Sequence, residues 1–209
     1  MNKERKLHGN KETVVKVCNW LSLPLQALGG CILYLVIEAF SRHSLAAAWS
    51  YMVESPWVFL YNAFLIFTTF MVVYLFRRRV LVRLIMSCFW LLLGIINGVI
   101  LANRVTPFTG PDLRNLSDGA KVVTKYLSKG TMILVAAALV ALLAFFVWVW
   151  IKGPKFQGKI RWYLNVPLIA LVIVLFTGAT NLALAKRVLS SYFVNIAFAY
   201  QDYGYPYCL

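Results

Sequence analysis

The 209 residues are 61% hydrophobic and 13% charged, with a formal net charge of +14 and a mean hydropathy of +0.74. An ordinary soluble domain has roughly 25% charged residues, so this composition excludes a soluble fold. Several apolar runs approach the roughly 20 residues that cross a bilayer, which predicts an all-α, polytopic membrane protein. Basic residues beside such runs set orientation and contact anionic headgroups, so no nucleic-acid partner is expected.

The predicted elements begin with a basic cytoplasmic leader at residues 1–18. A membrane domain at residues 19–185 follows, and its apolar runs predict five transmembrane helices at about 19–40, 57–76, 80–101, 131–151 and 162–185. A cleaved signal peptide is the alternative for the first run, because Ala46-Ala47-Ala48 offers a cleavage site. The first run is longer than the roughly 7–15 apolar residues of a signal peptide, which favours an uncleaved anchor.

An ion pair is predicted near the outer end of the first span. Glu38 lies near that end, and Arg42 follows four residues later on the same helical face. We expect a local pair on the protein surface at the membrane interface, because a charged side chain inside hydrocarbon is costly.

Small residues in the third and fifth spans predict close helix contacts. The third span contains Gly94 and Gly98, a GxxxG spacing that lets another helix approach, and Asn97 can hydrogen-bond across that contact. The fifth span contains Gly178 and Asn181 among several alanines. These residues are interpreted as helix-packing positions and not as catalytic residues.

The distribution of Lys and Arg predicts the orientation. With the N-terminus inside, thirteen of the 21 basic residues lie on the inner side, in the leader, around Arg77-Arg78-Arg79 and around Lys152. The other eight lie outside, and five of them belong to the single long loop at 103–130. Cytoplasmic loops carry the excess of positive charge, so we predict an inside N-terminus and an outside C-terminus. The loop 103–130 and the tail 186–209 are then extracellular, and the chain is expected in the plasma membrane.

The loop 103–130 combines turn signals with a short helix. Thr106-Pro107 and Gly110-Pro111-Asp112 predict two turns. An interfacial helix is predicted after Ser117 or Asp118, with Gly130 as its stop. Its apolar and basic positions form two neighbouring stripes, as in a helix that lies among lipid headgroups: Ala120, Val123 and Leu127 beside Lys121, Lys125 and Lys129. A solvated face on a connector helix is the alternative.

No catalytic centre can be assembled from the chain. Its two histidines, His8 and His43, are predicted on opposite sides of the membrane, and it has no HExxH, paired CxxC, phosphate loop or nucleophile elbow. Asp112 and Asp118 could approach a divalent cation, but loop and capping roles are favoured. Cys208 is predicted outside, without a partner in the chain. We therefore predict no catalytic residue, metal or cofactor in this chain.

Two stretches resemble a known family. One is Asn97 followed by Arg104-Val105-Thr106-Pro107 and Asp112-Leu113, between the third and fourth of five spans. The other is the ending Ala199-Tyr200-Gln201-Asp202-Tyr203-Gly204-Tyr205-Pro206-Tyr207-Cys208 after the fifth span. Together they resemble the membrane domain of the lipoteichoic acid synthase family of sulfatase-like phosphoglycerol transferases, over essentially the whole chain. One departure is Val105, where that family often has Gly.

The resemblance implies a second, extracellular, sulfatase-like domain with a threonine nucleophile and a manganese site. That domain transfers glycerol phosphate from phosphatidylglycerol to a growing polymer. No residue of this chain matches it, so the tail 186–209 is interpreted as the start of a linker to it. Arginine forks bind phosphate in two-pronged fashion. The predicted headgroup-binding residues are Arg104, Pro107, Asp112, Arg114, Lys121 and Lys125.

The leading hypothesis from the sequence is a membrane anchor and lipid-substrate platform of such a transferase, not catalytic on its own. Its expected partners are an anionic phospholipid such as phosphatidylglycerol and a sulfatase-like catalytic domain in cis or in trans. The alternative is a small non-enzymatic membrane protein, either a transporter subunit or a partner-binding scaffold. No ionisable side chain is predicted deep in a span, which argues against a proton-coupled transporter.

Overall fold

The computed structural model describes residues 22–114, 129–153, 160–193 and 195–209. Every regular element in these ranges is helical, and none of them is a strand. The helices are α2 (Ser22–Ser41), α3 (Leu45–Glu54), α4 (Pro56–Phe70), η1 (Met71–Leu75), α5 (Arg79–Leu101), α6 (Gly110–Arg114), α8 (Lys129–Lys152), α9 (Trp162–Ala185), α10 (Ile196–Tyr203) and α11 (Tyr205–Cys208).

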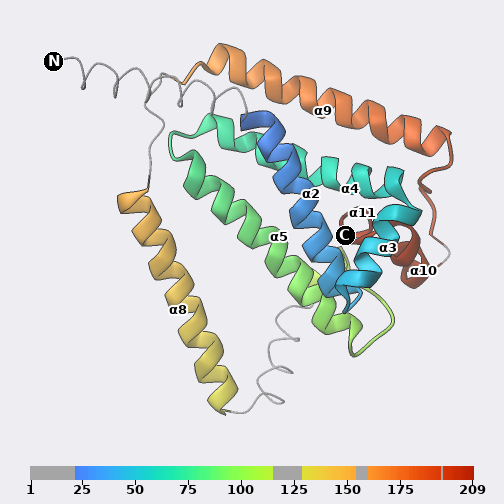
Figure 1. The fold of residues 1–209 in the computed structure, drawn as a ribbon, viewed down its shortest axis with the longest axis horizontal. Helices are drawn as coiled ribbons and strands as arrows, with labels where there is room; N and C mark the ends of the chain where they lie inside the picture. Colours follow the sequence, from blue (N-terminus) through green and yellow to red (C-terminus); the bar gives the residue numbers. More distant parts are fainter. Residues whose placement is uncertain (1–21, 115–128, 154–159, 194) are drawn as a thin grey trace.

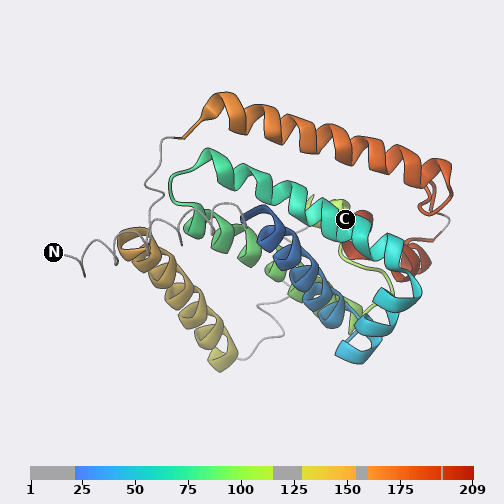
Figure 2. The ribbon, with the colours of Figure 1, turned by 45° about the horizontal axis from the view of Figure 1, so that its top comes forward.

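Helix α2 lies at the centre of the described bundle, in contact with α3, α4, α5 and α11. Helix α4 lies between α9 and the pair formed by α2 and α5, whereas α8 lies on the far side of α5 (Figures 1 and 2). The core is built where these helices meet, around the fully buried side chains of Tyr34, Ile37 and Ile66. The chain therefore buries one side of α2 against α4 and the other against α5.

Four of the described helices are long and apolar enough to cross a membrane. They span Ser22–Ser41, Pro56–Leu75, Arg79–Leu101 and Trp162–Ala185, and each matches a predicted span to within a few residues. The predicted span 131–151 falls within α8, whose described apolar stretch is Val140–Lys152. The count of five spans and the inside–outside orientation stay predictions.

Local sequence explains where the second of these helices begins and ends. Pro56 occupies the first turn of α4, where its missing N–H would have no partner in any case. The helix then tightens into the 3-10 segment η1 before the extended residue Phe76. The basic triplet Arg77-Arg78-Arg79 follows and leads directly into α5.

The GxxxG spacing of α5 lies against α2. A Cβ atom added at Gly94 would be 3.1 Å from the Ile37 side chain, and one added at Gly98 would be 2.7 Å from the Phe40 carbonyl oxygen. The absence of side chains therefore brings the two backbones together. Asn181, in contrast, is exposed on α9, so the structure does not bring it to a helix contact of the kind expected for it.

Asn97 joins three segments at the same contact. Its Nδ2 donates to Ser41 Oγ at 2.9 Å, and its Oδ1 accepts from the Phe108 backbone N–H at 2.8 Å. The Asn97 side chain is fully buried. It therefore ties the end of α2 and the loop after α5 to α5 itself.

The helix ends gather at two opposite ends of the bundle (Figure 1). We call one the arginine end, where α2, α5 and α9 begin, η1 ends, and Arg77-Arg78-Arg79 and Arg83 lie. There the Arg78 guanidinium stands 4.9 Å above the ring of Trp150. We call the other the clasp end, where α2 and α5 terminate beside α3, α10 and α11.

The chain after α9 is folded and does not run out as a plain extended tail. Helices α10 and α11 lie beside α3 at the clasp end (Figure 1), and α11 contacts both α2 and α4. Asn195 caps α10 by accepting from the Ala197 backbone N–H at 2.9 Å. Tyr205, the first residue of α11, is fully buried. This part of the predicted tail is therefore an element of the bundle core.

Candidate functional site

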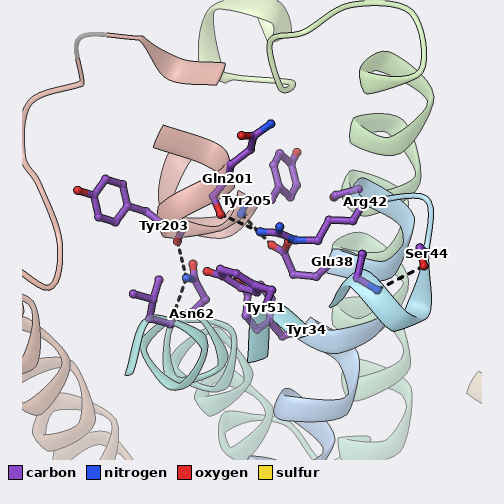
Figure 3. A network of polar contacts seen from close by, with 12 residues as sticks. Tyr34, Glu38, Arg42, Ser44, Tyr51, Asn62, Gln201, Tyr203 and Tyr205 are labelled. Carbon is purple, nitrogen blue, oxygen red and sulfur yellow. Dashed lines mark hydrogen bonds and ion pairs between the residues drawn. The ribbon is translucent and has the colours of Figure 1, made fainter. Parts of the chain in front are cut away.

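A buried ion pair anchors the C-terminal helices to α2 (Figure 3). Arg42 Nε donates to Glu38 Oε2 at 3.0 Å, and the second carboxylate oxygen accepts from the Tyr205 backbone N–H at 3.0 Å. Arg42 Nη2 also donates to the Gln201 carbonyl oxygen at 2.9 Å. The Glu38 side chain has 0% exposure, so the prediction of a surface pair was wrong. The cause is the return of the C-terminal segment, which covers the carboxylate and satisfies it.

Asn62 of α4 forms the second anchor of this segment. Its Nδ2 donates to the carbonyl oxygens of Val58 at 3.0 Å and Tyr203 at 2.7 Å. Its Oδ1 accepts from the Tyr207 backbone N–H at 2.9 Å. One buried amide thus holds both sides of the junction between α10 and α11 (Figure 3).

Gly204 occupies that junction with φ +80° and ψ 161°. This backbone region is open essentially only to glycine. A Cβ atom here would collide with the Tyr34 hydroxyl and lie 3.0 Å from both Tyr51 Oη and Asn62 Nδ2. We call the assembly of Glu38, Arg42, Asn62 and the segment 200–208 the clasp.

Burial in the clasp changes the acidity of the groups it covers. It raises the pKa of the Cys208 thiol to about 12. Burial also raises the pKa of the Tyr51 and Tyr205 hydroxyls above their usual value. The thiol is therefore protonated at neutral pH, and the side chain of Cys208, which was predicted outside the membrane domain, is buried.

A polar cleft of about 650 Å³ opens beside the clasp. Its walls come from the turn after α2, the end of α5 and helix α10. Three basic side chains line it, namely Arg42, His43 and Arg104, together with Ser41, Ala47, Leu101, Ala102, Asn103, Val105, Tyr200 and Gln201. We call this the basic cleft.

Arg104 is held in the basic cleft by its own loop. It forms a two-pronged pair with Asp112, with Nη1 to Oδ1 at 3.1 Å and Nη2 to Oδ2 at 2.6 Å. Its Nε and Nη2 also donate to the carbonyl oxygens of Thr106 and Pro107, each at 2.9 Å. The hydrogen bonds from Arg104 hold the pKa of Asp112 below its usual value, and bonds from Thr109 act in the same direction. The predicted turn at 106–112 is therefore folded around this guanidinium.

In both ion pairs the cation is the more exposed partner. The Arg42 side chain is 18% exposed and Glu38 is 0% exposed, while Arg104 is 41% exposed and Asp112 is 25% exposed. Each carboxylate fixes the orientation of the guanidinium group that it pairs with. Each guanidinium is therefore the partner of its ion pair that is more accessible to a ligand in the basic cleft.

The structure brings together only part of the predicted headgroup set. Arg104 and Asp112 are paired, and Arg114 is exposed at the end of α6. Pro107 is fully buried, so its ring cannot touch a headgroup, and its contribution is the carbonyl oxygen that accepts from Arg104. The predicted interfacial helix, with Lys121 and Lys125, lies outside the described residues.

Two of the basic residues in the cleft were not expected from the sequence. The sequence predicts only a local pair for Arg42 and no partner for His43. His43 adopts φ 53°, which turns the chain sharply between α2 and α3 beside Arg42. A basic pair directly after a span was a usable signal, because a span end is where interfacial charges gather.

The described residues offer no cluster of three or more His, Cys, Asp or Glu that could hold a metal ion. Asp118, the suggested neighbour of Asp112, lies outside the described residues. Ser41, His43 and Tyr200 line the basic cleft, but none of the described hydrogen bonds joins a hydroxyl to His43, and the Ser41 hydroxyl accepts from Asn97. The described geometry therefore shows no paired nucleophile and base there.

Comparisons with protein-family models, with curated proteins and with solved structures found no match. The resemblance to the lipoteichoic acid synthase family therefore rests on the two short stretches and their order along the chain.

Proposed function

We propose that this chain is the membrane anchor and lipid-substrate platform of a lipoteichoic acid synthase-like phosphoglycerol transferase. It holds an anionic phospholipid headgroup in the basic cleft and leaves the bond-breaking chemistry to a sulfatase-like partner domain. The observation that carries this proposal is the meeting of three basic side chains on one cleft: Arg42 and His43 come from the turn after α2, and Arg104 comes from the loop after α5.

The chemistry of the cleft supports an anionic headgroup. Guanidinium groups offer planar pairs of N–H donors that match phosphate oxygens. A volume of about 650 Å³ lies within the roughly 300–1,000 Å³ of small-molecule sites, and a glycerophosphate headgroup fits well inside it. The buried Glu38 carboxylate fixes the orientation of Arg42, and the partly exposed Asp112 fixes that of Arg104, so both guanidinium groups are held in place before an anion arrives.

A separate apolar groove favours a lipid ligand over a soluble anion. It is formed by the first turns of α4 and the last turns of α9. It has a volume of about 590 Å³ and lies between α4 and α9. Apolar side chains line nearly all of it, including Trp57 and Phe64, and Lys186 is its charged residue. A groove of this composition suits an acyl chain. The Lys186 ammonium group would then lie near the phosphate of the same lipid.

The experiment measures lipid selectivity of the purified chain in nanodiscs. Native mass spectrometry compares retention of phosphatidylglycerol with that of phosphatidylcholine for the wild type, Arg104→Gln and Asp112→Asn. We expect Arg104→Gln to lower the preference for phosphatidylglycerol by roughly threefold to tenfold, the usual range for one charge-assisted contact. Asp112→Asn removes the carboxylate that orients Arg104, so it should also lower that preference.

The matched control is Arg161→Gln, which removes an exposed arginine at the arginine end, just before α9. Its selectivity should equal that of the wild type. An Arg104→Gln variant that keeps full selectivity would remove the headgroup role. The transferase role has its own readout: in cells that supply the catalytic domain, Arg104→Gln should reduce polymer synthesis while membrane insertion is unchanged.

A further inference from the structure

A third pocket lies at the arginine end, at the opposite end of the bundle from the basic cleft. It has a volume of about 390 Å³ and is formed by α2, α4 and α5. Its lining combines polar groups with small and apolar ones: Ser22, Leu25, Gln26, Gly29, Gly30, Phe70, Arg83 and Ser87. A Cβ atom at Gly29 would meet no atom within 4 Å, so Gly29 leaves room at the α2 wall.

Gln26 of α2 brings an unsatisfied donor to this pocket. The residue is 7% exposed, and its Nε2 has no hydrogen-bond partner among the described residues. Its Oε1 accepts from Arg83 Nε at 3.4 Å. The opposite amide orientation would set two donors against each other, so Arg83 determines which way the amide points. A buried amide of this kind needs an acceptor, because leaving it unpaired is costly.

Arg83 supplies a charge that no described carboxylate balances. Its Nη2 donates to Ser22 Oγ at 2.9 Å, and this hydroxyl is in turn 2.9 Å from Tyr74 Oη. The described partners of Arg83 are thus neutral oxygens, together with the Tyr74 ring 6.0 Å from its Cζ. Arg42 and Arg104 differ, since each of them has a carboxylate.

Among the described residues, the pocket wall therefore carries donors and a cation but no acid. Gln26 Nε2, the Arg83 guanidinium and the hydroxyls of Ser22 and Ser87 line one space. Such a set matches an oxyanion that accepts several hydrogen bonds at once. We propose that this pocket binds a phosphate group, presented either by a phospholipid headgroup or by free phosphate. The site is separate from the basic cleft and does not depend on the proposed function.

The test uses the full chain in nanodiscs of phosphatidylcholine, with thermal unfolding as the readout. One arm adds inorganic phosphate against sodium chloride of equal ionic strength, and the other replaces part of the lipid with phosphatidylglycerol. We expect the unfolding temperature to rise in at least one arm. A rise with inorganic phosphate that Arg104→Gln keeps identifies free phosphate as a ligand of this pocket. A rise only with phosphatidylglycerol that Arg104→Gln keeps identifies the lipid headgroup.

Gln26→Glu is the decisive variant, because it places a carboxylate beside Arg83 and so supplies the missing anion. It should unfold at a higher temperature than the wild type without ligand, and its response to phosphate should fall by about tenfold in apparent affinity. Ser87→Ala, a milder change at the wall, should weaken the response without a large loss of stability. Arg161→Gln, outside the pocket, should respond like the wild type.

Two results would overturn the proposal. One is a wild type that gains no stability in either arm, which would mean that water alone satisfies Gln26. The other is a Gln26→Glu variant that responds to phosphate as strongly as the wild type, because the added carboxylate should exclude the anion. Both results leave the basic cleft untouched, since Arg104 lies at the other end of the bundle.

Discussion

Substituting Gly204 with alanine tests the clasp most directly. Gly204 joins α10 to α11 with φ +80° and ψ 161°, a conformation that side chains with a Cβ rarely adopt. The new methyl group would clash sterically with the Tyr34 hydroxyl, and Tyr51 Oη and Asn62 Nδ2 would each lie 3.0 Å away. These atoms belong to buried residues of three different helices, so none of them moves without disturbing the core.

The expected loss of stability has two parts. Backbone strain at this position costs about 1–3 kcal/mol. Overpacking a closed core costs about 1–3 kcal/mol more. The free energy of unfolding should therefore fall by about 2–6 kcal/mol. At about 2–4 °C per kcal/mol for a chain of this length, the unfolding temperature should drop by roughly 5–20 °C.

The assay is thermal unfolding of the detergent-solubilised protein, followed by tryptophan fluorescence. Gly178→Ala is the matched control, because a Cβ atom at Gly178 in α9 meets nothing within 4 Å and alanine favours a helix. Adding Tyr34→Phe to Gly204→Ala should restore part of the loss, since the hydroxyl is the nearest obstacle. The reasoning is refuted if Gly204→Ala and Gly178→Ala unfold at the same temperature.

Three further predictions concern other parts of the described structure. Gly98→Ala should lower the unfolding free energy by about 1–3 kcal/mol, because its Cβ would lie 2.7 Å from the Phe40 carbonyl oxygen, whereas Gly29→Ala in the same assay should be neutral. The buried Cys208 thiol, with its pKa raised to about 12, should react with a maleimide only after denaturation, as counted by mass spectrometry; rapid labelling of the folded protein would contradict its burial. Because the pKa of Asp112 is lowered in the folded state, its ion pair contributes stability above the unfolded pKa of about 3.9, and this contribution is lost as pH falls through the lower folded pKa. Unfolding temperatures measured from neutral to acid pH should show this loss in the wild type, and Asp112→Asn should lack that component.

The long helices could be predicted because crossing a membrane requires a minimum apolar length. The predicted span 162–185 coincides with α9, and 80–101 differs from α5 by a single residue. The charge pattern also identified the arginine end, since polar triplets such as Arg77-Arg78-Arg79 cannot remain in an apolar run. These inferences use only local composition, which a sequence displays directly.

The clasp could not be predicted, because its partners are far apart in the chain. The hydrogen bond from Tyr205 to Glu38 joins residues 167 positions apart. No motif or spacing in the sequence indicates that these two residues are in contact. Spacing of four residues indicated that Glu38 and Arg42 would pair, but burial depends on what later covers them. Helices of eight and four residues, such as α10 and α11, are also too short to produce a periodic signal.

The basic cleft shows why packing residues and binding residues cannot be treated as separate sets. Arg42 lies one residue after the end of α2, and Arg104 lies three residues after the end of α5. The two meet in one cleft because Gly98 lets the backbone of Phe40 approach, and because Asn97 ties Ser41 to the loop that carries Arg104. A bulkier residue at the Gly98 contact would separate the two arginines before it unfolded the bundle. Lipid selectivity should therefore be more sensitive to the α2–α5 contact than to the apolar faces of α9, although neither Gly98 nor Asn97 lines the cleft itself.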